Sequence, residues 1–350
     1  MNKSHILYRE DINGILSVKG IERLRGKRFL ITGATGMVGV MLIDTLMALG
    51  DTHVYAVGRN KEKAADRLDE YYGSDLFTFI EQDVYLPLPD VKVDFIIPLA
   101  SNTHPLAYSQ YPVETMLTNI KGVEHALNLA VRCNATVLYP STVEVYGNAR
   151  GKDVFTEDYT GKLNLATSRS CYTESKRTAE ALCQSFIAEK GAHVCIARLC
   201  RIFGPTMLMS DSKASSQFIK KALAGEDIVL KSEGTQFFSY TYVADAIAGL
   251  LTVLLNGENG VAYNVSSEKT NVHLKDFAQM CAEYNGRNVI FDLPSETEAK
   301  GFSIATQAIM DNNMIKTIGF IPRYEMADAV RRTIQILNNE QSGEQVMMRE

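Results

Sequence analysis

Between residues 27 and 199, short apolar runs alternate with longer segments in which apolar side chains recur three and four positions apart. Short apolar runs bounded by turn residues predict buried strands, and the three-and-four spacing predicts amphipathic helices. The expected strands are residues 27–32, 53–57, 77–81, 94–99, 135–141 and 193–199. The expected helices are residues 37–49, 61–72, 112–133 and 171–190.

Strands that alternate with helices of this length form βαβ units around a parallel sheet. We therefore predict an α/β protein with a Rossmann-type, doubly wound parallel sheet. After residue 203 the alternation becomes less regular, and this change predicts a smaller C-terminal α/β lobe. Its expected helices are residues 215–224, 244–255 and 273–284.

These patterns divide the chain into an N-terminal extension, a Rossmann domain, a lobe and a frayed tail. A short helical piece is expected within the extension, at residues 21–25. The expected limits are 1–26 for the extension, 27–202 with 235–265 for the Rossmann domain, 203–234 with 266–340 for the lobe, and 341–350 for the tail.

The composition is that of an ordinary globular protein, because 46% of the 350 residues are apolar and 22% are charged. A net charge of −5 argues against a nucleic-acid partner, which would require a basic stripe. The sequence has no uncharged apolar run of about 18 residues, and its charged start lacks the apolar core of a signal peptide. We therefore expect a cytoplasmic protein without a membrane segment.

The six cysteines and six histidines are dispersed, without a Cys-x-x-Cys pair or a cluster of metal-ligand spacing. Most of the cysteines lie in apolar helix or strand patterns. They are expected to be buried free thiols in a reducing cytoplasm, and no metal site is expected.

A glycine-rich turn follows the first expected strand and opens the first expected helix, with Gly33, Gly36 and Gly39 three positions apart. The first glycine lets the chain turn tightly, the second lets backbone N–H groups approach a pyrophosphate, and the third lets the helix pack close to the strand. The helix N-terminus then faces the anion. The spacing differs from the commoner G-x-G-x-x-G, but its position predicts a dinucleotide phosphate site.

The end of the second strand normally carries the residue that contacts the adenosine ribose. An acidic residue there favours NAD, and an arginine accommodates the phosphate of NADP. This chain has Arg59 and no acid at that point, although Arg59 is also compatible with a solvated residue at a helix start. We expect NAD as the cofactor, with NADP as the open alternative.

Tyr172 and Lys176 form a Y-x-x-x-K spacing at the start of an expected helix. Four residues is about one turn, so both side chains share a face. A tyrosine alone, with a pKa near ~10, is a poor acid–base group at neutral pH. A neighbouring ammonium and the positive nicotinamide ring stabilise its phenolate, which predicts an acid–base pair.

Thr142 and Glu144 follow the fifth expected strand. In an extended chain, residues two apart point to one face, here at the carboxyl end of the sheet where ligands bind. A hydroxyl there can bond a reacting oxygen, and a carboxylate can move a proton next to a carbonyl. The alternative for Glu144 is a loop-capping or ion-paired carboxylate.

Together these motifs resemble the extended short-chain dehydrogenase/reductases, the NAD-dependent epimerase/dehydratase family that acts on nucleotide sugars. The likeness runs from about residue 28 to 337. The matching segments are GATGMVG at 33–39, Asp83-Val84, Leu99-Ala100-Ser101, Asn119, STVEVYG at 141–147, YTESK at 172–176, RLCRIFGP at 198–205 and YTYVADA at 240–246.

The resemblance implies that the smaller C-terminal α/β lobe is the substrate lobe, which binds the nucleotide sugar, and it implies roles for these residues. Asp83 would contact the adenine, and Asn119 and Lys176 would hold the catalytic residues and the nicotinamide ribose. Thr142 and Tyr172 would bracket the sugar C4 hydroxyl, whose proton Tyr172 takes while hydride leaves C4. The other cofactor contacts would be Gly33, Thr35, Gly36, Met37, Val38, Gly39, Arg59, Val84, Leu99, Ala100, Ser101 and Ser141, and the substrate contacts would be Thr103, Thr142, Arg169, Arg201 and Gln217.

The 4-keto sugar so formed can lose water, epimerise or lose CO₂. We favour a 4,6-dehydratase-type reaction with Glu144 as the base at C5, and a UDP-glucuronate decarboxylase-like enzyme is the alternative. Thr-x-Glu is similar to both classes, but Val143 stands where several dehydratases have an acid. Segments 169–177 and 205–218 look most like the decarboxylases.

Two positions depart from the family pattern. Phe237 stands where members usually have an arginine that contacts pyrophosphate, and Arg201 stands where they usually have an asparagine. A relocated phosphate or carboxylate contact, or a surface salt bridge, would explain Arg201.

A net NAD(P)-dependent reductase and a non-catalytic nucleotide sensor are the remaining hypotheses. The resemblance also implies a homodimer that forms through the helices at residues 112–133 and 171–190.

Overall fold

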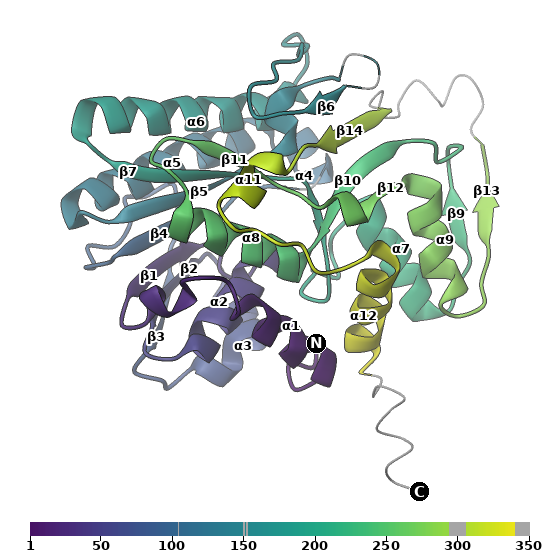
Figure 1. The fold of residues 1–350 in the computed structure, drawn as a ribbon, viewed down its shortest axis with the longest axis horizontal. Helices are drawn as coiled ribbons and strands as arrows, with labels where there is room; N and C mark the ends of the chain where they lie inside the picture. The colour runs from purple at the N-terminus through teal and green to yellow at the C-terminus, as the bar shows by residue number, and fades with distance from the viewer. Residues whose placement is uncertain (104, 150, 152, 294–305, 340–350) are drawn as a thin grey trace, which may run out of the picture.

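The large sheet of the protein has seven parallel strands. A computed structural model describes residues 1–350 except 104, 150, 152, 294–305 and 340–350 (Figure 1). The strand order, β11-β7-β5-β4-β1-β2-β3, reverses direction between β1 and β4, which confirms the doubly wound Rossmann-type sheet. The strands are β1 (Arg28–Thr32), β2 (His53–Gly58), β3 (Phe77–Glu81), β4 (Phe95–Pro98), β5 (Thr136–Thr142), β7 (His193–Leu199) and β11 (Ala262–Val265).

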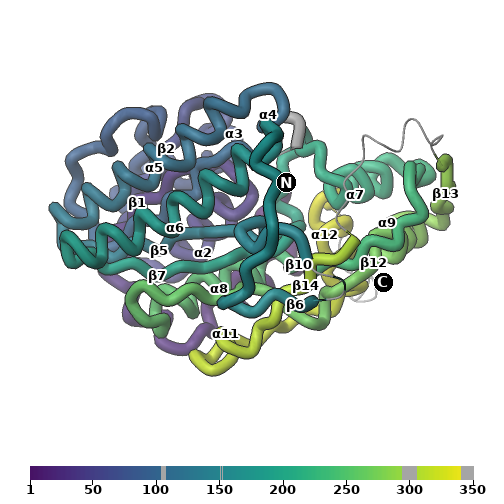
Figure 2. The backbone as a smooth tube through the Cα atoms, turned by 90° about the horizontal axis from the view of Figure 1, so that it is seen from above, coloured from purple at the N-terminus to yellow at the C-terminus, as the bar shows by residue number. Residues whose placement is uncertain are grey.

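Helices cover both faces of this sheet, which is why its strands are apolar on both sides. On one face, Leu30, Ile96 and Val137 pack in one cluster with α5 (Pro112–Cys133) and α6 (Ser170–Lys190). On the other face, the alternate residues Phe29 and Ile31 pack with the helices on that side. Those helices are α2 (Met37–Leu49), α3 (Lys61–Leu68) and α8 (Val243–Asn256) (Figure 2).

The C-terminal lobe is built on a second sheet, in the order β12-β10-β14-β6, with β8 on β10, and on the small pair β13-β9. Its strands are β6 (Val154–Phe155), β8 (Arg201–Phe203), β9 (Ile228–Leu230), β10 (Phe237–Tyr242), β12 (Asn271–His273), β13 (Val289–Phe291) and β14 (Gln307–Met310). Its helices are α7 (Ala214–Ala224), α9 (Leu274–Glu283) and α12 (Met326–Asn338). The short helices are α4 (Pro105–Gln110), α11 (Asn313–Thr317) and the 3-10 turns η2 (Asp69–Tyr71), η3 (Val143–Tyr146) and η4 (Glu268–Thr270).

The expected return of residues 235–265 to the Rossmann domain needs a correction. Strand β11 extends the large sheet and α8 packs on it, but β10 lies in the lobe sheet. The reason is that β10 pairs with three lobe strands, β12, β14 and β8. Strand β6, from within residues 27–202, also joins the lobe sheet through β14. The tail at 341–350 lies outside the described residues.

The N-terminal segment contains a helix that the periodicity did not predict, α1 (Ile6–Ile15), before the expected helical piece, which is the 3-10 turn η1 (Ile21–Leu24). Helix α1 packs against α2, α8 and α12, and therefore joins the Rossmann domain to the lobe (Figure 1). Within the described part of the chain, no helix is long and apolar enough to cross a membrane.

A buried carboxylate holds α1 in place. Asp11 is fully buried and accepts hydrogen bonds from the Tyr242 hydroxyl at 2.5 Å and the Tyr324 hydroxyl at 2.8 Å. The Arg332 guanidinium of α12 donates to the same carboxylate from Nη2 at 2.6 Å and from Nε at 3.0 Å. Burial raises the pKa of Asp11, while the Arg332 charge opposes this shift.

We expect Arg332→Met to lower the free energy of unfolding by about 3–5 kcal/mol, because it leaves a buried carboxylate without its cation. Urea denaturation measures this change. Glu10→Gln is the matched control, since it removes only the half-exposed carboxylate that pairs with Arg332 at 3.1 Å and should change stability by less than about 1 kcal/mol. Equal effects of the two substitutions would show that Asp11 does not depend on Arg332.

Candidate active site

The glycine turn between β1 and α2 leaves no room for a side chain at Gly33 or Gly39. Gly33 has a φ of +63°, and a Cβ there would lie 2.8 Å from the backbone nitrogen of Ala100. A Cβ on Gly39 would lie 2.6 Å from the carbonyl oxygen of Gly33. Helix α2 begins after Gly36 without a side-chain cap, so its first N–H groups are available to an anion. Thr35, Met37 and Val38 lie in the same turn.

The segment after β4 lies against this turn at the point where the strand order reverses. The Ala100 N–H donates to the Thr32 hydroxyl at 3.1 Å, and Leu99 is packed against the core. Ser101 follows, half-buried. From the lobe, the Thr206 hydroxyl donates to the Met37 carbonyl oxygen at 2.8 Å. The turn is therefore fixed both by the sheet and by the lobe.

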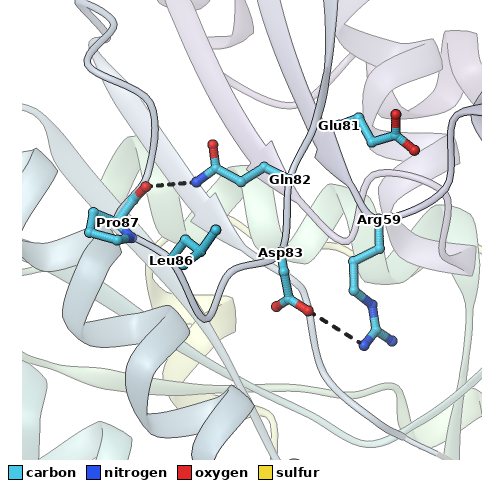
Figure 3. Close-up of a pocket in the computed structure, with 6 residues that line it drawn as sticks. All are labelled: Arg59, Glu81, Gln82, Asp83, Leu86 and Pro87. Atoms are coloured by element: carbon cyan, nitrogen blue, oxygen red, sulfur yellow. Dashed lines mark hydrogen bonds and ion pairs between the residues drawn. The ribbon is translucent and has the colours of Figure 1, made fainter.

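A hollow lies beside the ends of β2 and β3 (Figure 3). Arg59 forms an ion pair with Glu114 at 3.0 Å and a longer one with Asp83 at 3.8 Å. Val84 is buried, and its carbonyl oxygen contacts the His125 ring at 2.9 Å. The lining residues are Arg59, Glu81, Gln82, Asp83, Leu86 and Pro87.

Tyr172 and Lys176 lie one turn apart on α6 and face the end of β5. The Thr142 hydroxyl lies close enough to the Tyr172 phenol to lower its pKa, and the Lys176 ammonium donates to the Pro140 carbonyl oxygen at 3.0 Å. Lys176 also lies over the Tyr139 ring, 5.1 Å from its centroid. The structure thus brings together three of the four expected catalytic residues around the carboxyl end of one strand.

Burial tunes both groups of the pair. It raises the pKa of the Tyr172 phenol, and the nearby Glu144 charge raises that pKa further. Burial lowers the pKa of Lys176 to about 8. Lys176 therefore keeps its positive charge below about pH 8, where the ammonium can stabilise a phenolate on Tyr172.

Glu144 lies close to Tyr172 and Lys176, but the backbone geometry that places it there differs from the predicted one. The chain does not stay extended after Thr142, because residues 143–146 turn into η3, and the Glu144 N–H donates to the Thr142 hydroxyl at 3.3 Å. The expectation of one shared strand face is therefore wrong. Both Glu144 carboxylate oxygens lie 2.9 Å from the Arg169 guanidinium, and Oε2 also accepts from the Thr173 hydroxyl at 3.1 Å.

Tyr108 packs beside Tyr172 and Arg169, and none of the sequence motifs predicted it. Its ring lies 5.5 Å from the Tyr172 ring, and the Arg169 guanidinium lies over it at 4.4 Å. Burial and the Glu144 charge raise the pKa of Tyr108 to about 12. Tyr108 comes from α4, far from the other members in the chain, and no local spacing connects it to them.

The buried polar atoms that have no hydrogen-bond partner among the described residues include the Asn119 Oδ1 and the Ser141 Oγ. The Asn119 amide nitrogen donates to the Ser175 hydroxyl at 2.8 Å, and that hydroxyl donates to the Tyr172 carbonyl oxygen at 2.9 Å. Asn119 therefore positions the start of α6. The free polar atoms, the glycine turn and the Lys176 ammonium fit a bound dinucleotide.

The expected substrate contacts are more spread out. Thr103 is exposed in the loop after β4, and the Gln217 amide on α7 donates to the Asp211 carbonyl oxygen at 2.9 Å. Arg201, on β8, has its guanidinium 3.7 Å from the Phe238 ring centroid. Phe237 packs on the His273 ring at 4.7 Å. Among the described residues, no group of His, Cys, Asp or Glu could hold a metal ion.

Comparison with known proteins agrees with this geometry. The model of a family described as the NAD dependent epimerase/dehydratase family matches residues 29–266. UDP-glucuronic acid decarboxylase 6 of Arabidopsis thaliana is 37% identical over 233 residues, 67% of this chain and 67% of that protein. UDP-glucuronic acid decarboxylase 1 of Danio rerio is 36% identical over 264 residues, 75% of this chain and 62% of that protein.

Among solved structures, the dTDP-glucose 4,6-dehydratase from Streptomyces venezuelae with NAD and TYD bound aligns with a TM-score of 0.76. The two sequences are 21% identical, and the alignment covers 89% of this chain and 97% of that one. At this identity the likeness concerns the fold.

We expect the protein to bind NAD at least about tenfold more tightly than NADP, because Asp83 and Glu114 would repel a 2′-phosphate placed beside Arg59. The double substitution Asp83→Asn/Glu114→Gln should narrow this preference by freeing Arg59. Glu81→Gln, in the same hollow, is the control and should leave the ratio unchanged. Fluorescence titration with NADH and NADPH measures the ratio of the two affinities. A ratio that the double substitution does not change would show that Asp83 and Glu114 do not set the preference.

Proposed function

Because the chain belongs to the NAD-dependent epimerase/dehydratase family of nucleotide-sugar enzymes, we propose that it decarboxylates UDP-glucuronic acid or a closely related nucleotide uronate. Two relatives that are named UDP-glucuronic acid decarboxylases support this choice over the 4,6-dehydratase reaction that the motifs alone favoured. The structural observation that carries the proposal is the pairing of Glu144 with Arg169.

That pairing bears on which reaction follows oxidation at C4. A 4,6-dehydratase needs a base that removes the C5 proton, and Glu144 was the candidate. In this structure, both Glu144 carboxylate oxygens accept hydrogen bonds from Arg169, and one also accepts from Thr173, so removal of a C5 proton by Glu144 would disturb these contacts. Decarboxylation needs no base at C5, because departure of CO₂ leaves the electron pair there.

The family cofactor, held by the glycine turn and Lys176, would supply a hydride acceptor for oxidation at C4 and a hydride donor for the later reduction. Tyr172 takes the proton of the C4 hydroxyl, while the Thr142 hydroxyl, which lies near the Tyr172 phenol, orients that oxygen. Lys176 holds positive charge next to the phenol and favours its ionised form. The 4-keto uronate is a β-keto acid, so the C5–C6 bond breaks to CO₂ and a C4 enolate.

The net reaction consumes one proton and replaces the carboxylate by hydrogen. The C4 oxygen carries the enolate charge, and it lies against Thr142 and Tyr172 in this assignment, where hydroxyl donors stabilise it. C5 is then protonated. Arg169 keeps Glu144 in position beside this carbon, where a water bound to the carboxylate can deliver the proton.

We expect purified protein with bound NAD to convert UDP-glucuronic acid to CO₂ and a UDP-pentose, without net NADH formation. Mass spectrometry reports a loss of 44 mass units, roughly the mass of CO₂, and absorbance at 340 nm reports any released NADH. Parallel reactions with UDP-glucose and dTDP-glucose serve as the comparison. Loss of water from either glucose nucleotide, without loss of CO₂ from the uronate, would establish a dehydratase, and stoichiometric NADH would establish a net dehydrogenase.

Tyr172→Phe should lower kcat by about 10²–10⁴-fold, because it removes the acid–base hydroxyl and leaves the ring packed on Tyr108. Steady-state kinetics measure kcat, and calorimetry should show nucleotide-sugar binding close to that of the wild type. Tyr72→Phe, a half-exposed tyrosine outside the site, is the control. Full activity of Tyr172→Phe would show that the phenol transfers no proton.

A further inference from the structure

Among the described residues, the Arg201 guanidinium has no carboxylate partner. Its Nη1 atom is buried and has no hydrogen-bond partner in the described part of the chain, and no carboxylate there lies within 4 Å of it. By contrast, Arg198 pairs with Glu180 at 2.7 Å and Arg332 pairs with Asp11 at 2.6 Å. The surface salt bridge that would have explained Arg201 is therefore absent among the described residues.

Packing on an aromatic ring fixes the orientation of the Arg201 guanidinium. The guanidinium carbon lies 3.7 Å from the Phe238 ring centroid, which is close cation–π stacking. Stacking occupies a face of the planar group and leaves the N–H groups at its edge available for a ligand. Phe238 and Arg201 come from neighbouring strands, β10 and β8, so the lobe sheet itself sets this geometry.

Strand register places Arg201 close to the reacting groups. Leu199 on β7 is the partner of Thr142 on β5, and Arg201 is two residues further along the chain. Two residues span at most about 7 Å and neighbouring strands lie about 4.8 Å apart, so the Cα atoms of Arg201 and Thr142 are separated by no more than about 12 Å. An arginine side chain together with one sugar ring bridges this distance.

The pKa of Tyr108 also indicates that Arg201 lies near the site. The Arg201 and Arg169 charges both lower the pKa of Tyr108 against the effect of burial, so both guanidinium groups lie near that phenol. Tyr108 in turn packs on Tyr172. Arg169 is paired with Glu144, whereas Arg201 is not compensated by any described residue.

We propose that Arg201 is a substrate-binding residue that donates hydrogen bonds to an anionic group of the nucleotide sugar, either its diphosphate or its C6 carboxylate. This assignment rests on the proposed function for the class of ligand. Both groups present pairs of charged oxygens, which match the edge of a guanidinium. The buried, unpaired Nη1 atom is then satisfied in the complex.

The test uses the NAD-loaded protein and calorimetric titration with UDP, UDP-glucose and UDP-glucuronic acid. Arg201→Met keeps an apolar chain on Phe238 and removes the charge and the donors, and Arg201→Lys restores the charge alone. Arg287→Met removes an exposed arginine of the lobe and is the matched control. Loss of a charge-assisted contact should weaken binding about ten- to a hundredfold in Arg201→Met, with partial recovery in Arg201→Lys.

The three ligands distinguish the two anionic groups. Weaker binding of all three ligands assigns Arg201 to the diphosphate, and weaker binding of UDP-glucuronic acid alone assigns it to the carboxylate. The thermal midpoint of ligand-free Arg201→Met should not fall, because the substitution removes a buried charge that has no described partner. Affinities within twofold of the wild type for every ligand, with a lowered midpoint, would overturn the proposal in favour of a structural role.

Turnover separates this proposal from the proposed function. Binding of UDP-glucuronic acid that depends on Arg201, without release of CO₂, would overturn the decarboxylase assignment and keep the binding residue. Failure of the wild-type protein to bind any of the three ligands would overturn both.

Discussion

The site depends on one buried cation, the Lys176 ammonium. It is almost completely removed from solvent, donates to the Pro140 carbonyl oxygen and lies over the Tyr139 ring. Burial lowers its pKa to about 8, and this value leaves the ammonium charged near neutral pH. Because this hydrogen bond ties α6 to the end of β5, it also sets how far the Tyr172 phenol lies from the Thr142 hydroxyl.

Two further contacts hold the surroundings of this pair. The chain of hydrogen bonds from Asn119 through Ser175 to the Tyr172 carbonyl fixes the start of α6 against α5. The Thr206–Met37 hydrogen bond fixes the lobe to the glycine turn. The acid–base pair, the phosphate turn and the lobe are therefore coupled through short polar contacts at the carboxyl edge of one sheet.

Much of the fold could be predicted because it rests on local periodicity. The limits of α2 and α5 agree with the three-and-four apolar spacing, since one face of each helix packs against the sheet. Helix α1 was missed because its buried face contains Asp11, a residue that periodicity counts as polar and that is buried only through partners on β10 and α12. Strand β10 was assigned to the wrong sheet because its sheet is set by pairing with strands that are distant in the sequence.

The candidate site divides in the same way. Tyr172, Lys176 and the glycine turn could be predicted from spacing, because one helical turn or one strand–helix junction brings each set together. The predicted extended backbone at Glu144 was wrong. A 3-10 turn follows Thr142, and this turn depends on a side-chain cap and not on residue alternation. The positions of Tyr108 and of the unpaired Arg201 guanidinium depend on where α4 and β8 lie in the fold, and neighbouring residues in the sequence do not indicate these positions.

The charge distribution of the site bears on where Arg201 can act during catalysis. In decarboxylation, negative charge leaves the C6 carboxylate and accumulates on the C4 oxygen. A cation bonded to the carboxylate stabilises the ground state more than the transition state and therefore slows the release of CO₂, whereas a cation on the diphosphate binds both states equally. In the proposed reaction, the hydroxyls of Thr142 and Tyr172 would bond the C4 oxygen, on which the new charge appears. For a decarboxylase, a diphosphate contact is thus the assignment of Arg201 that tightens binding without opposing the chemistry, and a carboxylate contact would have to weaken as the C5–C6 bond breaks.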